Sequence, residues 1–335
     1  MNYREAGVDI GRKANALQAA AAKIGETYTP EVLKGMGAFG GMLLASRLKG
    51  MREPVLVAST DGVGTKTLLA VQTGRYEGLG FDLVHHSVND ILVQGARPLF
   101  FMDYIASARL EETLLGAVLA SLAEACKAVG IPLLGGETAE MPGVYREGAL
   151  ELAGTIVGVV ERDEVVDGKK VRPGDVLLAL PSSGLHTNGY SLARRVFEGW
   201  NLEEPREELA GRSLAEALLE PHRCYLREVE RLWGAGVEVK AMVHITGGGV
   251  YENLPRVLPL GLGAEVWRGS FPVPPIFGLI QRAGQVEEQE MYRVFNMGLG
   301  YILVVSPDRV GEVQALLPQS HPVGRIIEGS GVQVV

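Results

Sequence analysis

Short apolar runs alternate with longer amphipathic stretches along this chain, and that alternation restricts the fold more than any other feature. Three apolar runs, each bounded by turn residues, predict strands at residues 54–59, 99–105 and 155–160. Residues 111–129 carry leucine, valine and alanine at helical spacing and stop at a glycine, which predicts a helix. A second helix is expected at about 82–94. This pattern is typical of a mixed α and β protein.

A polar, turn-rich stretch at residues 161–175 (ERDEVVDGKKVRPGD) interrupts this alternation, and a new apolar strand follows it at 176–180. The length of 335 residues suggests about two domains of roughly 150 residues each. We therefore expect a fold of class α+β with two mixed α/β domains, residues 1–166 and 167–335. In the second half, helices are expected near 190–198, 214–218 and 223–233, and strands near 239–244 and 301–305.

The charge balance excludes several classes of partner. The chain has 32 Lys and Arg against 40 Asp and Glu, a net charge of −8, and no basic block that would hold nucleic acid. No apolar run approaches the roughly 18 residues of a membrane span. The two cysteines, Cys126 and Cys224, form no metal-binding motif or disulfide framework. We expect a cytoplasmic protein with neither nucleic acid nor membrane as partner.

Glycine is in excess, with 44 residues, nearly twice the roughly 7% average. A single glycine cluster is explained by a tight turn, but six clusters with polar neighbours predict places where a ligand approaches the backbone closely. The clusters are GMGAFGG at 35–41, DGVGTK at 61–66, GGET at 135–138, SSGLHTNG at 182–189, TGGG at 246–249 and NMGLG at 296–300.

The first cluster matches the dinucleotide-binding pattern G-x-G-x-x-G, and Asp61 follows Gly40 by 21 residues, near the place of a ribose-binding acid. That fingerprint should open directly after a buried strand. Residues 28–34 (YTPEVLK) are polar, contain Pro30 and are interpreted as a turn and a helix. The dinucleotide interpretation is therefore a weak alternative.

The second cluster follows a predicted strand but is not a Walker A loop, because Thr65 rather than glycine precedes Lys66. Gly62 and Gly64 would let the backbone approach a phosphate, Lys66 would supply a positive charge, and Asp61 would hold Mg²⁺. An alternative stays open, in which Asp61 only caps the helix that follows.

Further acids lie in comparable positions. Asp90 lies in an apolar helix and needs a partner, and Glu137 lies inside GGET after a predicted strand. Together with Asp61 they fit a magnesium–nucleotide site, since Mg²⁺ takes one or two carboxylates plus phosphate oxygens. Asp103, inside an apolar strand, is a weaker candidate that we interpret as a structural hydrogen-bond anchor.

Among the histidines, His186 stands between SSG and TNG, where it would contact a substrate phosphate or transfer a proton. An equally weighted alternative is a histidine that only forms a turn. His244 ends a strand just before TGGG and would face the same cavity. The other histidines are interpreted as structural, at His85 and His86, or as surface residues next to prolines, at His222 and His321.

Taken in order, these motifs resemble the phosphoribosylformylglycinamidine cyclo-ligase family, also called aminoimidazole ribonucleotide synthetase. The resemblance covers residue 3 to about 300, and GGETAEMPG together with SSG-x-H-x-NGYS makes it highly specific. The segments that carry it are AGVDI at 6–10, STDGVGTK at 59–66, SVND at 87–90, QG at 94–95, PLFFMD at 98–103, GGETAEMPG at 135–143, SSGLHTNGYSL at 182–192, HITGGGVYENLPRVLP at 244–259 and EMYRVFNMGLG at 290–300.

The resemblance implies an ATP- and Mg²⁺-dependent ring closure. Formylglycinamidine ribonucleotide and ATP would give aminoimidazole ribonucleotide, ADP and phosphate. ATP would activate the formyl oxygen as a phosphate ester, and a nitrogen of the same substrate would attack that carbon. The family fold implies N-terminal domains that pair into a homodimer with nucleotide near the interface. It also implies a C-terminal domain with a mixed sheet flanked by helices, which contributes the ribonucleotide site.

Site roles carry over motif by motif, with His186 and Lys66 as the catalytic candidates. The metal-binding acids would be Asp61, Asp90 and Glu137. The ATP side would be Asp61, Gly62, Gly64, Thr65, Lys66, Gly135, Gly136, Glu137 and Thr138. The ribonucleotide side would be Ser183, His186, Asn188, His244, Thr246 and Gly247. The chain departs from the family pattern at Leu185, Thr187 and the pair His85-His86.

Relatives of the same fold perform other chemistry, and the cysteines argue against two of them. A selenophosphate synthetase usually carries a reactive cysteine near its start, but no cysteine precedes Cys126 here. A hydrogenase-maturation relative ends in a reactive cysteine, whereas this sequence ends at Val335. A remaining alternative of another class is a non-catalytic nucleotide-binding or scaffold protein that kept the fold. Such a protein would normally tolerate the loss of some of these acidic residues, yet Asp61, Asp90 and Glu137 are all present.

Overall fold

The computed structural model describes residues 10–335, so the first four residues of the AGVDI segment lie outside the described part. The chain divides into two compact units. Unit 1 comprises Met1–Ile91 and Ala96–Asp163, and unit 2 comprises Leu92–Gly95 and Glu164–Val335. Within residues 10–335, no helix is long and apolar enough to cross a membrane.

Unit 1 is built on a four-stranded sheet with the strand order β3-β6-β4-β5. Strands β3 (Pro54–Gly62) and β4 (Arg97–Ser107) both pair antiparallel with β6 (Leu150–Glu161). Strand β5 (Leu133–Glu140) pairs parallel with β4, as a helical crossover between them allows. The expected strands at 54–59, 99–105 and 155–160 are therefore confirmed.

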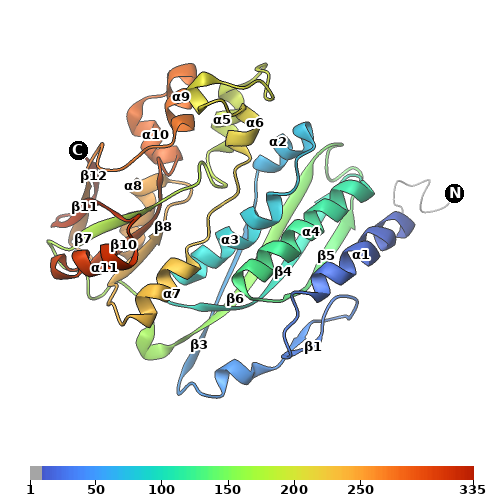
Figure 1. The fold of residues 1–335 in the computed structure, drawn as a ribbon, viewed down its shortest axis with the longest axis horizontal. Helices are drawn as coiled ribbons and strands as arrows, with labels where there is room; N and C mark the ends of the chain where they lie inside the picture. Colours follow the sequence, from blue (N-terminus) through green and yellow to red (C-terminus); the bar gives the residue numbers. More distant parts are fainter. Residues whose placement is uncertain (1–9) are drawn as a thin grey trace. The chain divides into compact units, whose positions relative to one another are not determined.

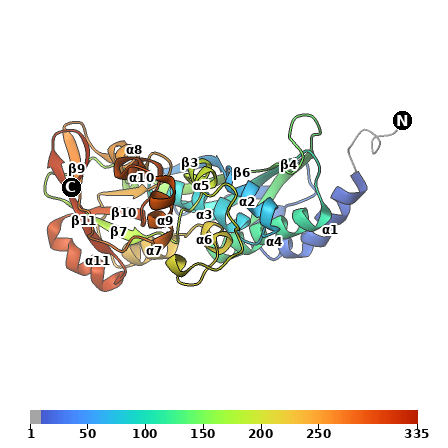
Figure 2. The same cartoon turned by 90° about the horizontal axis from the view of Figure 1, so that it is seen from above.

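Helices cover one face of this sheet. Helix α1 (Ile10–Gly25) lies side by side with α4 (Glu112–Val129), and α3 (Leu79–Leu92) lies beside them (Figure 1, Figure 2). The short helix α2 (Lys66–Thr73) follows β3. Inward-facing residues such as Phe101 and Ile105 are fully buried, whereas Leu56 and Met102, which point the other way, are 62% and 39% exposed. Within residues 10–335, no helix of unit 1 covers this second face, which is called the open face below (Figure 1).

The glycine cluster at residues 35–41 connects two short antiparallel strands, β1 (Val32–Lys34) and β2 (Met42–Leu43). The interpretation of residues 28–34 as a turn and a helix was wrong, because they form turns and a strand. The pattern G-x-G-x-x-G still lacks its dinucleotide context, since β1 is not buried and a strand rather than a helix follows the glycines.

Unit 2 contains a six-stranded sheet with the order β12-β9-β11-β7-β10-β8. Its pairs are antiparallel except for β12 with β9, so the expected mixed sheet is confirmed. The strands are β7 (Val176–Pro181), β8 (Ala241–His244), β9 (Leu262–Val266), β10 (Leu299–Val305), β11 (His321–Glu328) and β12 (Gly331–Val334).

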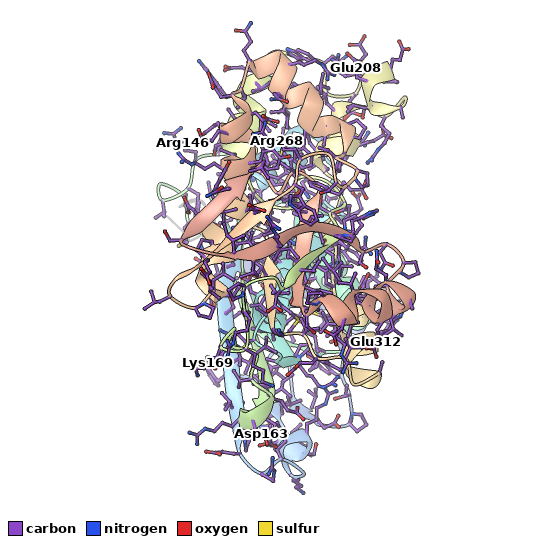
Figure 3. The ribbon with its side chains drawn as sticks, turned by 90° about the vertical axis from the view of Figure 1, so that its left-hand side faces the viewer. Arg146, Asp163, Lys169, Glu208, Arg268 and Glu312 are labelled. Atoms are coloured by element: carbon purple, nitrogen blue, oxygen red, sulfur yellow. The ribbon has the colours of Figure 1, made fainter. Side chains whose placement is uncertain are left out.

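Helices flank this second sheet, as expected. They are α5 (Tyr190–Val196), α6 (Leu214–Leu218), α7 (Leu226–Gly234), α8 (Gly249–Asn253), α9 (Pro275–Gly284), α10 (Glu288–Val294) and α11 (Val310–Leu316). Helix α7 shows why the sequence folds this way: Leu226, Val229 and Leu232 recur at helical spacing, and all three are buried. Charged side chains such as Lys169 and Arg268 stay exposed on the surface (Figure 3).

Candidate functional site

Two of the predicted metal-binding acids meet around one histidine in unit 1. Asp61 lies near the end of β3, and Asp90 lies on α3, one helical turn beyond His86. The Nε2 atom of His86 lies 2.8 Å from Oδ2 of Asp61 and 3.4 Å from Oδ2 of Asp90. Ser59 donates a hydrogen bond to the same Asp90 oxygen over 3.3 Å. The fold thus gathers two carboxylates from β3 and α3 at one point.

The imidazole of His86 carries a positive charge at neutral pH. Burial by itself disfavours the charged ring, but hydrogen bonds and charges from Asp61 and Asp90 outweigh burial and raise the pKa of His86 from 6.5 to about 9. Burial also opposes ionisation of Asp61, yet the His86 hydrogen bond and charge hold the pKa of that carboxyl below its usual value. The imidazolium therefore neutralises part of the negative charge that a metal ion would otherwise balance.

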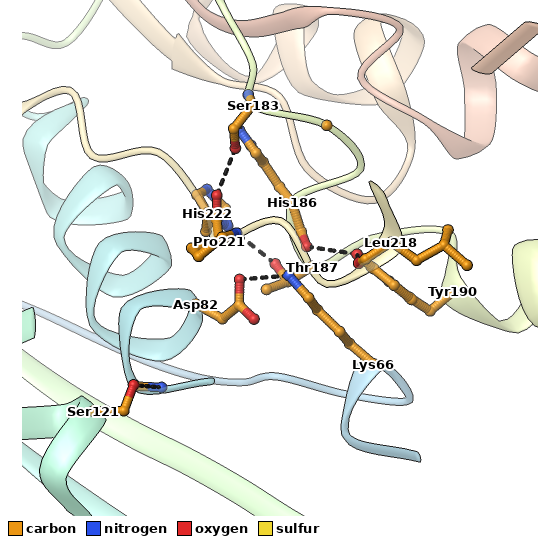
Figure 4. Close-up of polar contacts among 12 residues, drawn as sticks. Lys66, Asp82, Ser121, Ser183, His186, Thr187, Tyr190, Leu218, Pro221 and His222 are labelled. Atoms are coloured by element: carbon orange, nitrogen blue, oxygen red, sulfur yellow. Dashed lines mark hydrogen bonds and ion pairs between the residues drawn. The ribbon is translucent and has the colours of Figure 1, made fainter. Parts of the chain in front are cut away.

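Lys66, predicted to face ATP, begins α2 and points into unit 1. Its Nζ atom donates to Oδ1 of Asp82 on α3 over 2.7 Å, and neither side chain is exposed (Figure 4). Burial of both charges makes this ion pair a structural link between α2 and α3. A phosphate contact by Lys66 would require the ammonium group to leave or share Asp82.

The turn between Asp61 and Lys66 has the backbone freedom that the sequence suggested. Gly64 has a φ of 67°, in the left-handed region that favours glycine. Thr65 is the N-cap residue of α2 and makes no capping hydrogen bond with its side chain. Asp61 instead accepts a hydrogen bond from the Gly62 N–H and contacts His86. Asp61 therefore does not cap α2, and the capping alternative was wrong.

The GGET residues form part of strand β5 rather than the expected loop. Thr138 is buried and Glu137 is exposed, with Glu137 Oε1 accepting a hydrogen bond from the Thr138 N–H. Gly136 lies so close to β4 that an added Cβ atom would stand 2.4 Å from Oδ1 of Asp103. An added Cβ at Gly135 would meet nothing within 4 Å. Only the second glycine is required by packing.

The strand register places two acids in one row across the sheet. Asp61 pairs with Gly154, Gly154 pairs with Asp103, and Asp103 pairs with Gly136. Paired residues face the same side of a sheet, so both carboxyls point to the helix-covered face. Glu137 belongs to the next row and to the opposite face. Its backbone is three strands from Asp61, or roughly 14 Å, so the structure does not gather all three predicted metal-binding acids.

Two cavities adjoin β5 in unit 1. One, of about 360 Å³, is lined by Asp103, by the four GGET residues and by residues 36–39 of the first glycine cluster. The other, of about 430 Å³, lies along the open side of the sheet and includes Thr60 and Tyr104. Both are of the size of small-molecule sites. GGET thus lies beside space that a ligand can occupy.

In unit 2, the SSGLHTNG segment forms a strained loop between β7 and α5. His186 has a φ of 62°, an uncommon value for a residue with a side chain. The Ser183 N–H donates to Nε2 of His186 over 3.2 Å, and the Ser183 hydroxyl donates to the Pro221 carbonyl over 2.6 Å (Figure 4). Because Nε2 accepts, the proton of the neutral ring lies on Nδ1. The loop fixes both the position and the tautomer of His186.

Three histidines of unit 2 form one buried cluster. The ring of His186 stacks on that of His222 with centroids 3.9 Å apart, and Nε2 of His222 lies 2.9 Å from Nε2 of His244. All three side chains are at most 5% exposed. The expectation that His222 is a surface residue was wrong, because the loop that follows Pro221 packs inward against β8.

The remaining ribonucleotide-side candidates border the TGGG turn. An added Cβ atom at Gly247 would stand 3.3 Å from Oδ1 of Asn188, so the two segments are in contact. Asn253 holds the turn by donating to the carbonyls of Thr246, Gly247 and Gly249. Nδ2 of Asn188 is buried without a hydrogen-bond partner among the described residues. The structure therefore gathers Ser183, His186, Asn188, His244, Thr246 and Gly247 in unit 2.

Sequence reasoning missed two residues at these clusters and gave little weight to a third that borders a cavity. His86 was interpreted as structural, although its position four residues before Asp90 on a helix places both on one face. His222 offered no such local signal, because its partners come from two other segments. Asp103, the weaker candidate that the sequence analysis interpreted as a structural anchor, lines the cavity beside GGET.

Family models match most of the chain. The model described as AIR synthase related protein, N-terminal domain, matches residues 47–160, and the model for the C-terminal domain of that family matches residues 172–335. The phosphoribosylformylglycinamidine cyclo-ligase of Desulfitobacterium hafniense strain DSM 10664 / DCB-2 is 49% identical over 94% of this chain and 92% of its own. The enzyme of that name from Geobacillus thermodenitrificans is 47% identical over 98% of this chain and 96% of its own.

Solved structures share the fold at low sequence identity. A thiamine-monophosphate kinase from Stenotrophomonas maltophilia K279a superposes with a TM-score of 0.68 at 19% identity and covers 95% of both chains. A hydrogenase maturation protein HypE in complex with ATP gives a TM-score of 0.59 at 21% identity, covering 82% of this chain and 77% of its own. These likenesses support the mixed α and β fold.

Proposed function

Because the chain belongs to the phosphoribosylformylglycinamidine cyclo-ligase family, we propose that unit 1 holds ATP with Mg²⁺ and that unit 2 holds formylglycinamidine ribonucleotide. The chain is an ATP-dependent ligase of purine biosynthesis. Its reaction gives aminoimidazole ribonucleotide, ADP and phosphate.

One observation carries the proposal for unit 1: two carboxylates from β3 and α3 converge on a single cationic group, His86. Hard oxygen donors that already balance a positive charge fit a divalent cation once the imidazolium moves aside. Asp61 and Asp90 would hold Mg²⁺, and Glu137, on β5, would lie near the triphosphate instead of on the metal. Bound Mg²⁺ would offset the negative charge of the triphosphate.

The backbone around these acids suits ATP. Gly62, Gly64 and Thr65 lead into α2, and Gly135 offers open space beside β5. The ATP complex of the HypE relative supports a nucleotide role for this fold. Lys66 enters the proposal as a catalytic cation, on the condition that a bound phosphate competes with Asp82 for its ammonium group.

Unit 2 would position the ribonucleotide. Ser183, Asn188 and the Thr246–Gly247 turn would contact its polar groups, and His244 borders the same cluster. His186, with its proton on Nδ1, would donate to substrate or hold a phosphate oxygen. The attacking nitrogen belongs to the substrate, so the chain's task is to orient it, exclude water and stabilise charge.

The proposal includes a homodimer and a cytoplasmic location. The open face of the unit 1 sheet exposes Leu56 and Met102, apolar side chains of a kind that subunit interfaces bury. A second copy of the chain packed on this face would cover both. Leu56→Lys should therefore shift the sedimentation of the protein toward the monomer, and an unchanged sedimentation coefficient would exclude this face as the interface.

The assay mixes purified protein with ATP, Mg²⁺ and formylglycinamidine ribonucleotide and measures aminoimidazole ribonucleotide, ADP and phosphate. We expect all three products in equal amounts, and ADP formation that depends on the ribonucleotide. ATP loss that is indifferent to the ribonucleotide, or the absence of aminoimidazole ribonucleotide, would refute the assignment.

A further inference from the structure

The cavity of about 360 Å³ in unit 1 has the character of a site for a flat aromatic ring. Leu17 and Ile24 from α1, Leu119 from α4 and Leu133 from β5 line it, and Phe39 of the glycine cluster borders it. The Phe39 side chain is fully exposed in this structure. An exposed aromatic ring beside apolar walls is suited to stacking on a nucleobase.

Among these apolar walls, Asp103 supplies a carboxyl group. The cavity reaches one side of that carboxyl, while Gly136 packs against it from β5, where any larger residue would clash with Oδ1. Among the described residues, the Asp103 carboxyl receives a hydrogen bond only from its own backbone N–H, and no lysine or arginine pairs with it. An acceptor so placed is costly unless a ligand supplies a donor.

The surroundings of Asp103 are unfavourable to its charge. Burial, with a smaller contribution from Glu137, raises the pKa of Asp103 from 3.8 to about 7. In either protonation state the carboxyl keeps an oxygen that can accept a hydrogen bond. A neutral amino group is therefore a better partner than a further anion.

We infer that this cavity receives the adenine ring of ATP and that Asp103 accepts a hydrogen bond from the exocyclic 6-amino group. The inference rests on the proposed function, which places ATP in unit 1. It assigns a base-recognition role to a residue that the sequence indicated only as a weaker candidate, interpreted as a structural anchor. The triphosphate would then extend past GGET, which lines the same cavity.

The test compares two proteins, with and without the Asp103 carboxyl group, and two nucleotides, with and without the 6-amino group. Calorimetry measures the binding of ATP and of purine riboside triphosphate, which lacks the 6-amino group, to the wild-type protein in the presence of Mg²⁺. The same titrations are made on Asp103→Leu, which keeps a similar shape without an acceptor. Wild type should bind ATP about 10- to 100-fold more tightly than the purine analogue, as expected for one hydrogen bond to a carboxyl group. Asp103→Leu should abolish that preference.

A conservative variant separates recognition from folding. Asp103→Asn keeps a carbonyl oxygen as acceptor, so it should retain a preference for ATP over the analogue. Equal affinities of wild type for the two nucleotides would overturn the inference while leaving ATP binding intact. An unchanged ATP preference in Asp103→Leu would also overturn it. Failure of wild type to bind either nucleotide would overturn the inference together with the proposed ATP site, so the two failures are distinguishable.

Discussion

Nζ of Lys66 lies 2.7 Å from Oδ1 of Asp82, and both side chains are completely buried. Removing one partner of such a pair leaves an uncompensated charge in the interior. We expect Lys66→Met to lower the free energy of unfolding by about 3–5 kcal/mol, measured by denaturant titration. Lys127→Met is the matched control, because Lys127 pairs with Glu26 on the surface, where solvent screens the charges, and its loss should leave stability almost unchanged.

The double variant Lys66→Met with Asp82→Leu removes both charges and should recover much of the lost stability. If the recovered protein also regained full turnover, Lys66 would have no part in catalysis. A stable double variant without turnover would support a contact between Lys66 and phosphate. A single variant as stable as Lys127→Met would contradict the structural role.

Because the pKa of His86 is raised in the folded state, we expect the stability of the metal-free protein to depend on pH. The folded-state pKa of His86, about 9, exceeds the unfolded value of 6.5, so its contribution is fully present below pH 6.5 and is lost as the pH rises through 9. The shift corresponds to at most about 3 kcal/mol, and to less because solvent reaches the half-exposed Asp61. Wild type should therefore exceed His86→Gln in stability at pH 6 and match it near pH 10.

Unfolding titrations of both proteins across that pH range measure the difference. His321→Gln, on β11 of unit 2, controls for the loss of a histidine elsewhere. A difference between wild type and His86→Gln that does not change with pH would show that the imidazole is not charged between Asp61 and Asp90.

Local pattern was enough to predict most secondary structure. Helix α4 followed from the helical spacing of its apolar residues, most of which are buried. Strands β3, β4 and β6 followed from apolar runs bounded by turn residues. The interpretation failed at β1, where three residues pair only with the two of β2. A strand of three residues is too short to show a periodic pattern, and its pairing depends on the glycine-rich turn that connects β1 and β2.

Long-range contacts explain what the sequence left undetermined at the site. The sequence indicated Asp61 and Asp90 as candidate metal-binding acids, but their common contact with His86 depends on how α3 packs on β3. Lys66 resembled a phosphate-binding lysine because the motif shows only its neighbours in sequence. Its buried partner, Asp82, becomes visible only when α2 and α3 are folded together.

The two neighbouring glycines of GGET have different surroundings: Gly136 packs against β4, whereas Gly135 borders open space. A methyl group at Gly136 would stand 2.4 Å from Asp103 Oδ1 and 2.5 Å from the Asp103 carbonyl oxygen, whereas one at Gly135 would meet open space. We expect Gly136→Ala to lower the free energy of unfolding by about 1–3 kcal/mol through overpacking. Gly135→Ala should change it by no more than about 0.5 kcal/mol.

If ATP lies beside β5, Gly135→Ala should nevertheless weaken ATP binding, because its methyl group enters the space of the ligand. Thermal unfolding and calorimetric titration with ATP measure the two effects separately. Equal stabilities of the two variants would contradict the strand packing. A Gly135→Ala protein with unaltered ATP affinity would remove this residue from the nucleotide site.

Asp90→Asn tests the proposed metal site with minimal change of shape. The amide still accepts from Ser59 but no longer carries the charge that Mg²⁺ needs. We expect Mg²⁺-dependent turnover to fall by at least about 100-fold, as loss of roughly 3 kcal/mol of charge stabilisation implies. Asp163→Asn is the control, since that carboxylate is exposed and pairs with Arg52 at the surface. Calorimetry with Mg²⁺ and ATP supplies a readout besides turnover: the variant should need a higher Mg²⁺ concentration to bind ATP. Turnover and Mg²⁺ dependence equal to those of Asp163→Asn would exclude Asp90 as a metal ligand.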